Sequence, residues 1–514
     1  MAAAASACGG AGCGPQCSSS AGGEGDASSE SMGRLSISSA AAAAATCGKC
    51  DGGGAAVAVA GGVGMCVDCF RAHLFGKFKL AVTSNAMVRP TDAVLLAFSG
   101  GPASRVALQF IHEMQSKAIQ SWETSNSQAL PAFRLGVAFV DESVLSVRPG
   151  HEIDTAIEDI KSIVSSLSPG DKQLHVAPLE DVISSGSDDK AARLKELVGV
   201  INDETGRDDF IRCLRMLSLQ KIALENGYTK IMLGTCASGI ACHVLSATVK
   251  GQGYALPADV QYVDTRWEVP VVLPLHDCLA QELNLLCELD SLKTQQLLDR
   301  PCSGINGLVA SFVSRLREEN PSREHTILRT AQKLKPFSFN KFSANGYHDF
   351  LPSRLRPKFQ NIDANESTFS EILCLICGSP FSESELQNLE NTKHKAQKKT
   401  DLYAAHCCQS CHFQILPAAT DMHGHFFSLL PKFWTEKVDT ASASHSSLSS
   451  CYSQTHLTSG ICIVMRQTIT CQQISTDSIK TAQVGELNVS HLHVISDQLV
   501  SSPVLCQLFC QQTL

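Results

Sequence analysis

The chain has 514 residues, and 42 basic against 50 acidic side chains give it a net charge of −8 at pH 7. This balance excludes nucleic-acid binding through overall charge, so any such contact must come from local basic patches. The 23 cysteines accompany an N-terminus that lacks the basic and leucine-rich segments of a secretory signal. We therefore expect a reducing, cytoplasmic setting with metal-binding cysteines, and no membrane span, because no apolar stretch approaches ~18 residues.

Composition divides the first part of the chain into three segments. Residues 1–45 are almost entirely Ala, Gly and Ser, and they predict a disordered leader because they cannot offset the entropy cost of ordering. Residues 46–89 hold four cysteines and then a helix that mixes Phe with basic residues. Residues 90–300 alternate short apolar runs with amphipathic segments, which predicts an α/β domain whose parallel sheet is covered by helices.

The remaining chain also falls into three segments. Residues 301–365 predict helices followed by a basic region, and residues 366–435 hold a second cysteine set. Residues 436–514 are rich in Ser, Thr and Gln and show no sustained helix or strand period, so an irregular tail is expected.

The first cysteine set has the spacing C-x2-C-x15-C-x2-C. Two tight turns with this spacing can each present two thiolates to one tetrahedral zinc ion, and chance pairing of reduced core cysteines is the weaker alternative. Such closed sites are structural, because no position is left for water or substrate. The predicted ligands are Cys47, Cys50, Cys66 and Cys69.

The second cysteine set has a wider gap of thirty residues between its two pairs. The gap contains the polar run NTKHKAQKKT, which a zinc-held loop could extrude. Cys407 competes with Cys408 as a ligand, and the sequence does not distinguish zinc from iron. The predicted ligands are Cys374, Cys377, Cys408 and Cys411.

A glycine-containing turn follows the first apolar run of the α/β segment. The strand expected at 94–98 leads into the turn SGGPAS and then into an apolar helix. A strand, turn and helix in this order can point backbone N–H groups at a bound anion. The alternative interpretation is a tight turn that only connects the strand to the helix. The candidate nucleotide-binding residues are Ser99, Gly100, Gly101 and Ser104.

This turn resembles the PP-loop of ATP pyrophosphatases, whose motif is SGG-x-D-S. The resemblance implies an adenine nucleotide alpha hydrolase-like fold. Here Ala103 stands where the motif has Asp, and Pro102 stands where the tRNA-thiolating branch often has Lys. The backbone cradle is compatible with both changes, but the charged groups that would organise magnesium and phosphates are missing, so ATP binding is doubtful.

Residues 208–246 resemble the segment where tRNA thiolases carry a C-x-x-C pair and a strand that ends in GHNADD. In a gap-free alignment, the two cysteine positions fall at Asp208 and Ile211. The His-Asn-x-Asp-Asp run becomes Thr-Cys-Ala-Ser-Gly at 235–239. The polar groups have been replaced while the apolar framework remains, so no residue is predicted to be catalytic.

The N-terminal cysteine module is the segment 46–89. Together with it, these features make roughly residues 46–435 resemble the family of non-catalytic subunits of the cytoplasmic tRNA 2-thiolation complex. That resemblance implies a heterodimer with a catalytic PP-loop paralogue. It also implies contact with tRNA and, through the complex, with a ubiquitin-related sulfur carrier. The pair would thiolate carbon 2 of the wobble uridine.

Two basic clusters are candidates for RNA contact, although such runs are usually solvated surface. The first follows the N-terminal cysteines, where the neighbouring aromatic side chains are expected to be core. The second is denser and is the better candidate. The RNA-binding candidates are Lys77, Lys79, Arg329, Lys333, Lys335 and Lys341.

Three hypotheses for the function remain open at this point. The first is a catalytically silent subunit of a tRNA-thiolating complex. The second is an autonomous PP-loop sulfurtransferase with an unusual site, which the missing acid at Ala103 disfavours. The third is a zinc-dependent scaffold without an RNA role.

Overall fold

The computed structural model describes residues 46–50, 57–58, 64–125, 132–146, 150–167, 172–183, 189–295, 304–340, 372–393 and 398–439. The expected leader and nearly all of the expected tail lie outside these residues. The chain divides into two compact units, one up to Pro431 and one from Lys432 onward. The sheet, both cysteine groups and the cavities described below all belong to the first unit. In the second, residues 432–439 are helical.

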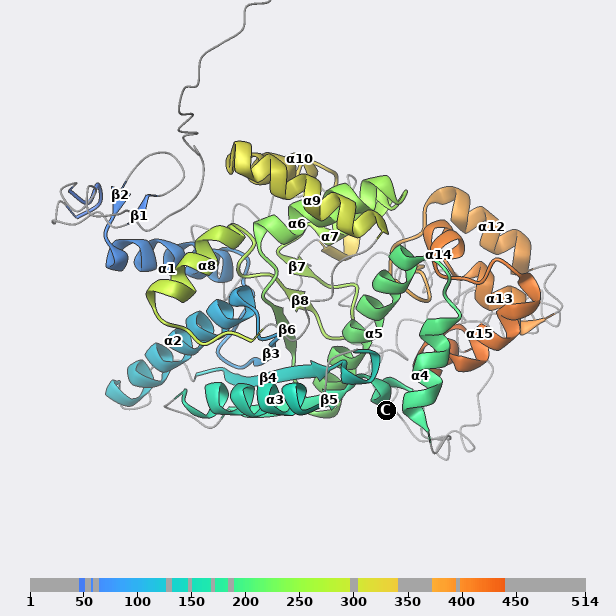
Figure 1. Cartoon of the computed structure of the whole chain (residues 1–514), viewed down its shortest axis with the longest axis horizontal. Coiled ribbons are helices and arrows are strands. Elements are labelled where there is room, and N and C mark those ends of the chain that lie inside the picture. The colour runs from blue at the N-terminus through green and yellow to red at the C-terminus, as the bar shows by residue number, and fades with distance from the viewer. Residues whose placement is uncertain are drawn as a thin grey trace, which may run out of the picture. The chain divides into compact units, whose positions relative to one another are not determined.

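A six-stranded sheet with the strand order β5–β4–β3–β6–β8–β7 forms the centre of the first unit (Figure 1). Neighbouring strands run parallel except at one edge, where β7 pairs antiparallel with β8. A separate two-stranded antiparallel hairpin, β1–β2, lies among the N-terminal cysteines. The strands are β1 Val57–Ala58, β2 Gly64–Met65, β3 Ala93–Ala97, β4 Arg134–Asp141, β5 Gln173–Pro178, β6 Lys230–Leu233, β7 Val263–Asp264 and β8 Val271–Val272.

Helices connect the parallel strands, as right-handed crossover units require. The long helices α2 and α5 follow β3 and β5, and α6 follows β6. The helices are α1 Val67–Ser84, α2 Pro102–Thr124, α3 Gly150–Ser165, α4 Lys190–Gly199, α5 Glu204–Glu225, α6 Ala237–Val249, α7 Leu256–Asp259, α8 Ala280–Leu289, α9 Gly304–Glu319, α10 Ser322–Ala331, α12 Glu383–Lys393, α13 Lys399–Ala405, α14 Gln409–Gln414 and α15 His423–Leu429. Short 3-10 turns lie at Ser143–Leu145, Leu179–Val182, Gly253–Ala255, Ser338–Asn340 and Thr420–Met422.

The predicted fold class is confirmed, because the sheet is mainly parallel and helices cover it. Four of the short apolar runs in residues 90–300 form β3, β4, β5 and β6. A further run, VPVVLPL at 269–275, yields only the two residues of β8, because Pro270 and Pro274 bound it and have no N–H group to donate. The antiparallel edge strand β7 was not predicted, since two residues give no periodic signal.

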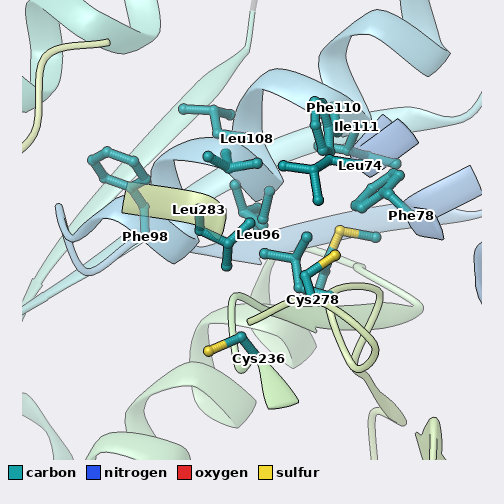
Figure 2. Packing of buried hydrophobic residues seen from close by; sticks show 14 of the residues in the cluster. Leu74, Phe78, Leu96, Phe98, Leu108, Phe110, Ile111, Cys236, Cys278 and Leu283 are labelled. Carbon is teal, nitrogen blue, oxygen red and sulfur yellow. The ribbon is translucent and has the colours of Figure 1, made fainter. Parts of the chain in front are cut away.

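One face of the sheet carries the main apolar core. Val94 and Leu96 of β3 join it while Leu95 between them is buried elsewhere, as the two-residue period of a strand requires. Helices α1, α2, α3 and α8 pack side chains against this face. Figure 2 shows Leu74 and Phe78 of α1 beside Phe110 and Ile111 of α2, and the Phe78 and Phe110 rings lie 5.4 Å apart edge to face.

The N-terminal cysteine module is therefore continuous with the α/β domain. Of the three aromatic side chains expected to be core, Phe70 and Phe78 are fully buried in this cluster, and Phe75 is partly buried against it. An ion pair from the Lys77 ammonium to the Glu282 carboxylate, 2.9 Å long, also joins α1 to α8. Helix α5 contacts β4, β5 and β6.

Candidate functional site

The glycine turn spans residues 98–101, between the end of β3 and the start of α2. Gly100 has a φ of +82°, and a Cβ atom there would lie 2.5 Å from the carbonyl oxygen of Gln295. The Gln295 amide donates a hydrogen bond of 2.9 Å to the Gly100 carbonyl. Position 100 thus requires glycine both for its left-handed conformation and for this close approach.

The two serine hydroxyls of the turn bond to the turn itself. Ser104 Oγ donates to the Gly101 carbonyl over 2.9 Å, and Ser99 Oγ lies 3.1 Å from Ser104 Oγ. Because Ser104 donates its only hydroxyl proton to Gly101, Ser99 Oγ must be the donor in the bond between the two serines. Both side chains therefore maintain the shape of the turn.

We expect Ser99→Ala to have a small effect. The substitution removes one partly buried hydroxyl–hydroxyl bond, which should lower the free energy of unfolding by about 1 kcal/mol or less. Thermal unfolding of the purified variant measures this change. A severe loss of function in a normally folded Ser99→Ala protein would show instead that the hydroxyl contacts a ligand.

A cavity of about 480 Å³ lies against this turn. Its walls come from the turn, the ends of β3, β4 and β6, and helix α5. Ala103, where the PP-loop motif has Asp, is one of the lining residues. The described polar lining includes three hydroxyls and two guanidinium groups but no carboxylate. These groups are Ser99, Ser104, Thr235, Arg212 and Arg215.

The segment after β6, where thiolases carry an acidic run, also lines this cavity through Gly234 and Thr235. Gly234 approaches the start of α2 so closely that a Cβ atom would lie 2.7 Å from the Ser104 Cα. Ser238, at an acid position of the run, is buried, and its hydroxyl donates to the Glu324 carboxylate over 2.6 Å. Burial raises the pKa of Glu324, whereas the Ser238 hydrogen bond acts in the opposite direction. Ser238 thus joins α6 to α10.

The two positions that correspond to the thiolase cysteines lie on α5. Ile211 is buried and Asp208 is partly exposed. The next residue, Arg212, is exposed and lines the cavity, although no sequence motif predicted it. Cys213 lies one residue further along, and burial raises the pKa of its thiol.

A second cavity, of about 270 Å³, adjoins the first. Cys377 and Cys411 contribute to its wall, so the C-terminal cysteine group borders it. Trp267 also lines this cavity, and its ring lies 3.2 Å from where a Gly378 Cβ would be. The residues common to both cavities are Arg212, Met216, Leu233 and Thr235.

The four cysteines of the C-terminal group come together although 37 residues separate the first from the last. Their Sγ atoms lie within 4.8 Å of one another, with Cys374–Cys411 at 3.7 Å and Cys377–Cys408 at 3.6 Å. A zinc–sulfur bond of about 2.3 Å gives a tetrahedron edge of about 3.8 Å, so the four thiols fit a tetrahedral metal ion. The competing Cys407 lies outside this quartet, and its Sγ contacts the Tyr403 carbonyl at 3.4 Å.

The N-terminal cysteines form a similar group at the start of α1. Cys50 and Cys66 have their Sγ atoms 3.9 Å apart, and all four sulfurs lie within 4.8 Å. The Cys66 amide donates to Cys47 Sγ over 3.3 Å, and chiefly for this reason the pKa of Cys47 falls to about 6. A low thiol pKa favours the thiolate that a metal ion binds.

The basic side chains predicted to contact RNA differ in whether they are exposed or paired with an acid. Lys77 is paired with Glu282, whereas Lys79 is exposed. Three candidates on or just after α10 are exposed: Arg329, Lys333 and Lys335. Lys341 lies outside the described residues.

Curated relatives cover most of the chain, although no family model matches it. "Cytoplasmic tRNA 2-thiolation protein 2" of Oryza sativa subsp. japonica is 76% identical over 452 residues, which are 87% of this chain and 96% of that protein. The protein of the same name from Arabidopsis thaliana is 50% identical over 374 residues, 73% of this chain and 81% of that one.

A solved structure, the U34-tRNA thiolase of Methanococcus maripaludis with its 4Fe-4S cluster, matches 56% of this chain and 87% of that chain. The identity is 18% and the TM-score is 0.42.

Within the described residues, no helix has the length and apolarity that a bilayer crossing demands. The relatives are named as cytoplasmic proteins, which confirms the predicted localisation. Since it shares 76% identity with a relative over most of both sequences, the chain belongs to the cytoplasmic tRNA 2-thiolation protein 2 family.

Proposed function

We propose that this protein is a non-catalytic subunit of a complex that 2-thiolates the wobble uridine of cytosolic tRNAs. It would support a catalytic PP-loop paralogue as a heterodimer and help to dock the tRNA. The observation that carries this proposal is the cavity at the glycine turn, whose described lining holds no carboxylate. Without an acid to hold magnesium, the shape of a nucleotide site remains but adenylation is not expected.

The two cysteine groups would hold structural zinc. Four thiolates complete a tetrahedron and leave no coordination position for a substrate, so zinc would supply stability and not chemistry. The N-terminal group would fix the start of α1, which packs on the core. The C-terminal group would fix the wall of the second cavity.

Docking of tRNA would involve the exposed basic side chains of α10 and the residues after it. Arg329, Lys333 and Lys335 are not paired with acids among the described residues, and Lys79 offers a further cation. Such groups neutralise phosphates without reading sequence. A ubiquitin-related sulfur carrier would reach the tRNA through the complex.

Deletion of the gene tests the proposal. We expect 2-thiouridine in bulk tRNA to fall to background, measured by mass spectrometry of nucleosides, and to return when the wild-type gene is restored. An unchanged level would overturn the proposal and favour a scaffold without an RNA role. Conversion of ATP to AMP and pyrophosphate by the purified protein alone would favour an autonomous enzyme.

A further inference from the structure

We propose that the cavity beside the glycine turn binds a phosphate group without a divalent cation, and that its ligand is a phosphodiester of the RNA backbone. This inference rests on the proposed function and deepens it, because it assigns one RNA contact to the inherited cavity. Arg212 is the residue that would provide the main charge. The exposed patch on α10 is a different surface.

The charges around the cavity favour an anion. Arg215 is held in place by the carboxylate of Glu142, which bonds its Nε and is itself buried. Arg212 has no ion pair or hydrogen bond within the part of the chain that the structure describes. Thr235 supplies a hydroxyl close to both cavities. A guanidinium without an acid partner, beside a cavity that lacks carboxylates, attracts phosphate.

The same lining disfavours a magnesium–nucleotide complex. Nucleoside triphosphates are bound with Mg²⁺, and proteins hold that ion through carboxylates. Ala103 and Gly239 have no carboxylate, and Ser238 is turned toward Glu324. Two guanidinium groups, one of them already paired, match the single charge of a phosphodiester better than the charge of a triphosphate.

The carboxylates that line the second cavity pair with cations other than Arg212. Each of its acidic side chains has a cationic partner: Asp209 binds the Lys250 ammonium at 2.6 Å, and Asp259 and Asp264 share Arg266. No unpaired carboxylate among the described lining residues therefore competes for Arg212. Because Arg212 is exposed, a polymer backbone could reach it from solvent.

The test measures binding of a fluorescein-labelled anticodon stem-loop RNA to the full-length protein by fluorescence anisotropy, in magnesium-free buffer without a chelator and at several salt concentrations. Arg212→Gln should weaken binding about tenfold and reduce the slope of log affinity against log salt by about one. Arg212→Lys should retain most of that slope. Lys221→Gln removes the same charge from an exposed position of α5 outside both cavities and should bind like the wild type.

Three results would overturn the inference: no RNA binding by the wild-type protein in magnesium-free buffer, wild-type affinity and slope in Arg212→Gln, or equal losses in Lys221→Gln. A parallel titration with labelled AMP separates the two sources of phosphate. If Arg212→Gln weakens AMP binding and leaves RNA binding intact, the ligand is a free nucleotide and the RNA assignment fails. Each of these outcomes leaves the role in 2-thiolation standing if gene deletion abolishes 2-thiouridine, but absence of RNA binding would remove the proposed part in tRNA docking.

Discussion

Replacing Cys408 with serine should destabilise the protein strongly and reduce its bound metal by one equivalent. Cys408 belongs to the quartet whose sulfurs fit a tetrahedral ion, and a serine hydroxyl is a poor substitute for a thiolate ligand. We expect a loss of at least about 3 kcal/mol in the free energy of unfolding and a Tm lower by about 6 °C or more. Metal analysis of the purified protein and thermal unfolding provide the measurements.

Cys407→Ser is the matched control, because it alters the neighbouring residue and removes the same sulfur. Cys407 lies outside the quartet, and a serine hydroxyl can replace its contact with the Tyr403 carbonyl. Metal content should stay at the wild-type level. If Cys407→Ser loses the metal and Cys408→Ser retains it, the ligand assignment is wrong.

Replacing Gly234 with alanine should disrupt the cavity at the glycine turn. The new Cβ would lie 2.7 Å from the Cα and 2.8 Å from the amide nitrogen of Ser104. Both are backbone atoms at the start of α2, so the end of β6 and the helix must move apart. Overpacking of this kind costs about 2–3 kcal/mol, and thermal or urea unfolding would show it.

Gly239→Ala provides the comparison for this prediction. Gly239 lies in the first turn of α6, and the nearest atom to its added Cβ is Thr235 Cγ2 at the ordinary distance of 3.6 Å. Because alanine favours helix, stability should be unchanged or slightly raised. Equal stability in Gly234→Ala and Gly239→Ala would contradict the close packing of β6 on α2.

The sequence predicts the sheet well wherever strands are long and apolar. β4 is eight residues long and buried along most of its length, so its pattern is unmistakable. The edge strand β7, of two residues, depends on tertiary pairing, and no local pattern could have predicted it. The shortening of β8 was predictable, because the prolines that flank it are visible in the sequence.

The candidate site was only partly predictable for a similar reason. Cysteine spacing and the SGG turn are local features, and the structure gathers the quartets and places the turn after β3 as expected. Arg212 was missed because no local motif marks it, although it directly follows Ile211 on the helix where the alignment places the thiolase cysteines. The contact of Trp267 with Gly378 joins positions more than a hundred residues apart and leaves no trace in either segment.

Residues of the sheet and of the C-terminal cysteine group line the same cavity, so the order in which they are synthesised affects how the cavity forms. During synthesis the last strand, β8, leaves the ribosome about 100 residues before Cys374, and translation at about 5–20 residues per second makes this an interval of roughly 5–20 s. Throughout that time the sheet lacks the wall that Cys377 and Cys411 provide, and Trp267 lacks its packing partner. Metal capture by the second quartet, as proposed above, would therefore come last. A cell short of the ion would accumulate chains in which the sheet has formed while this side stays exposed to chaperones and proteases.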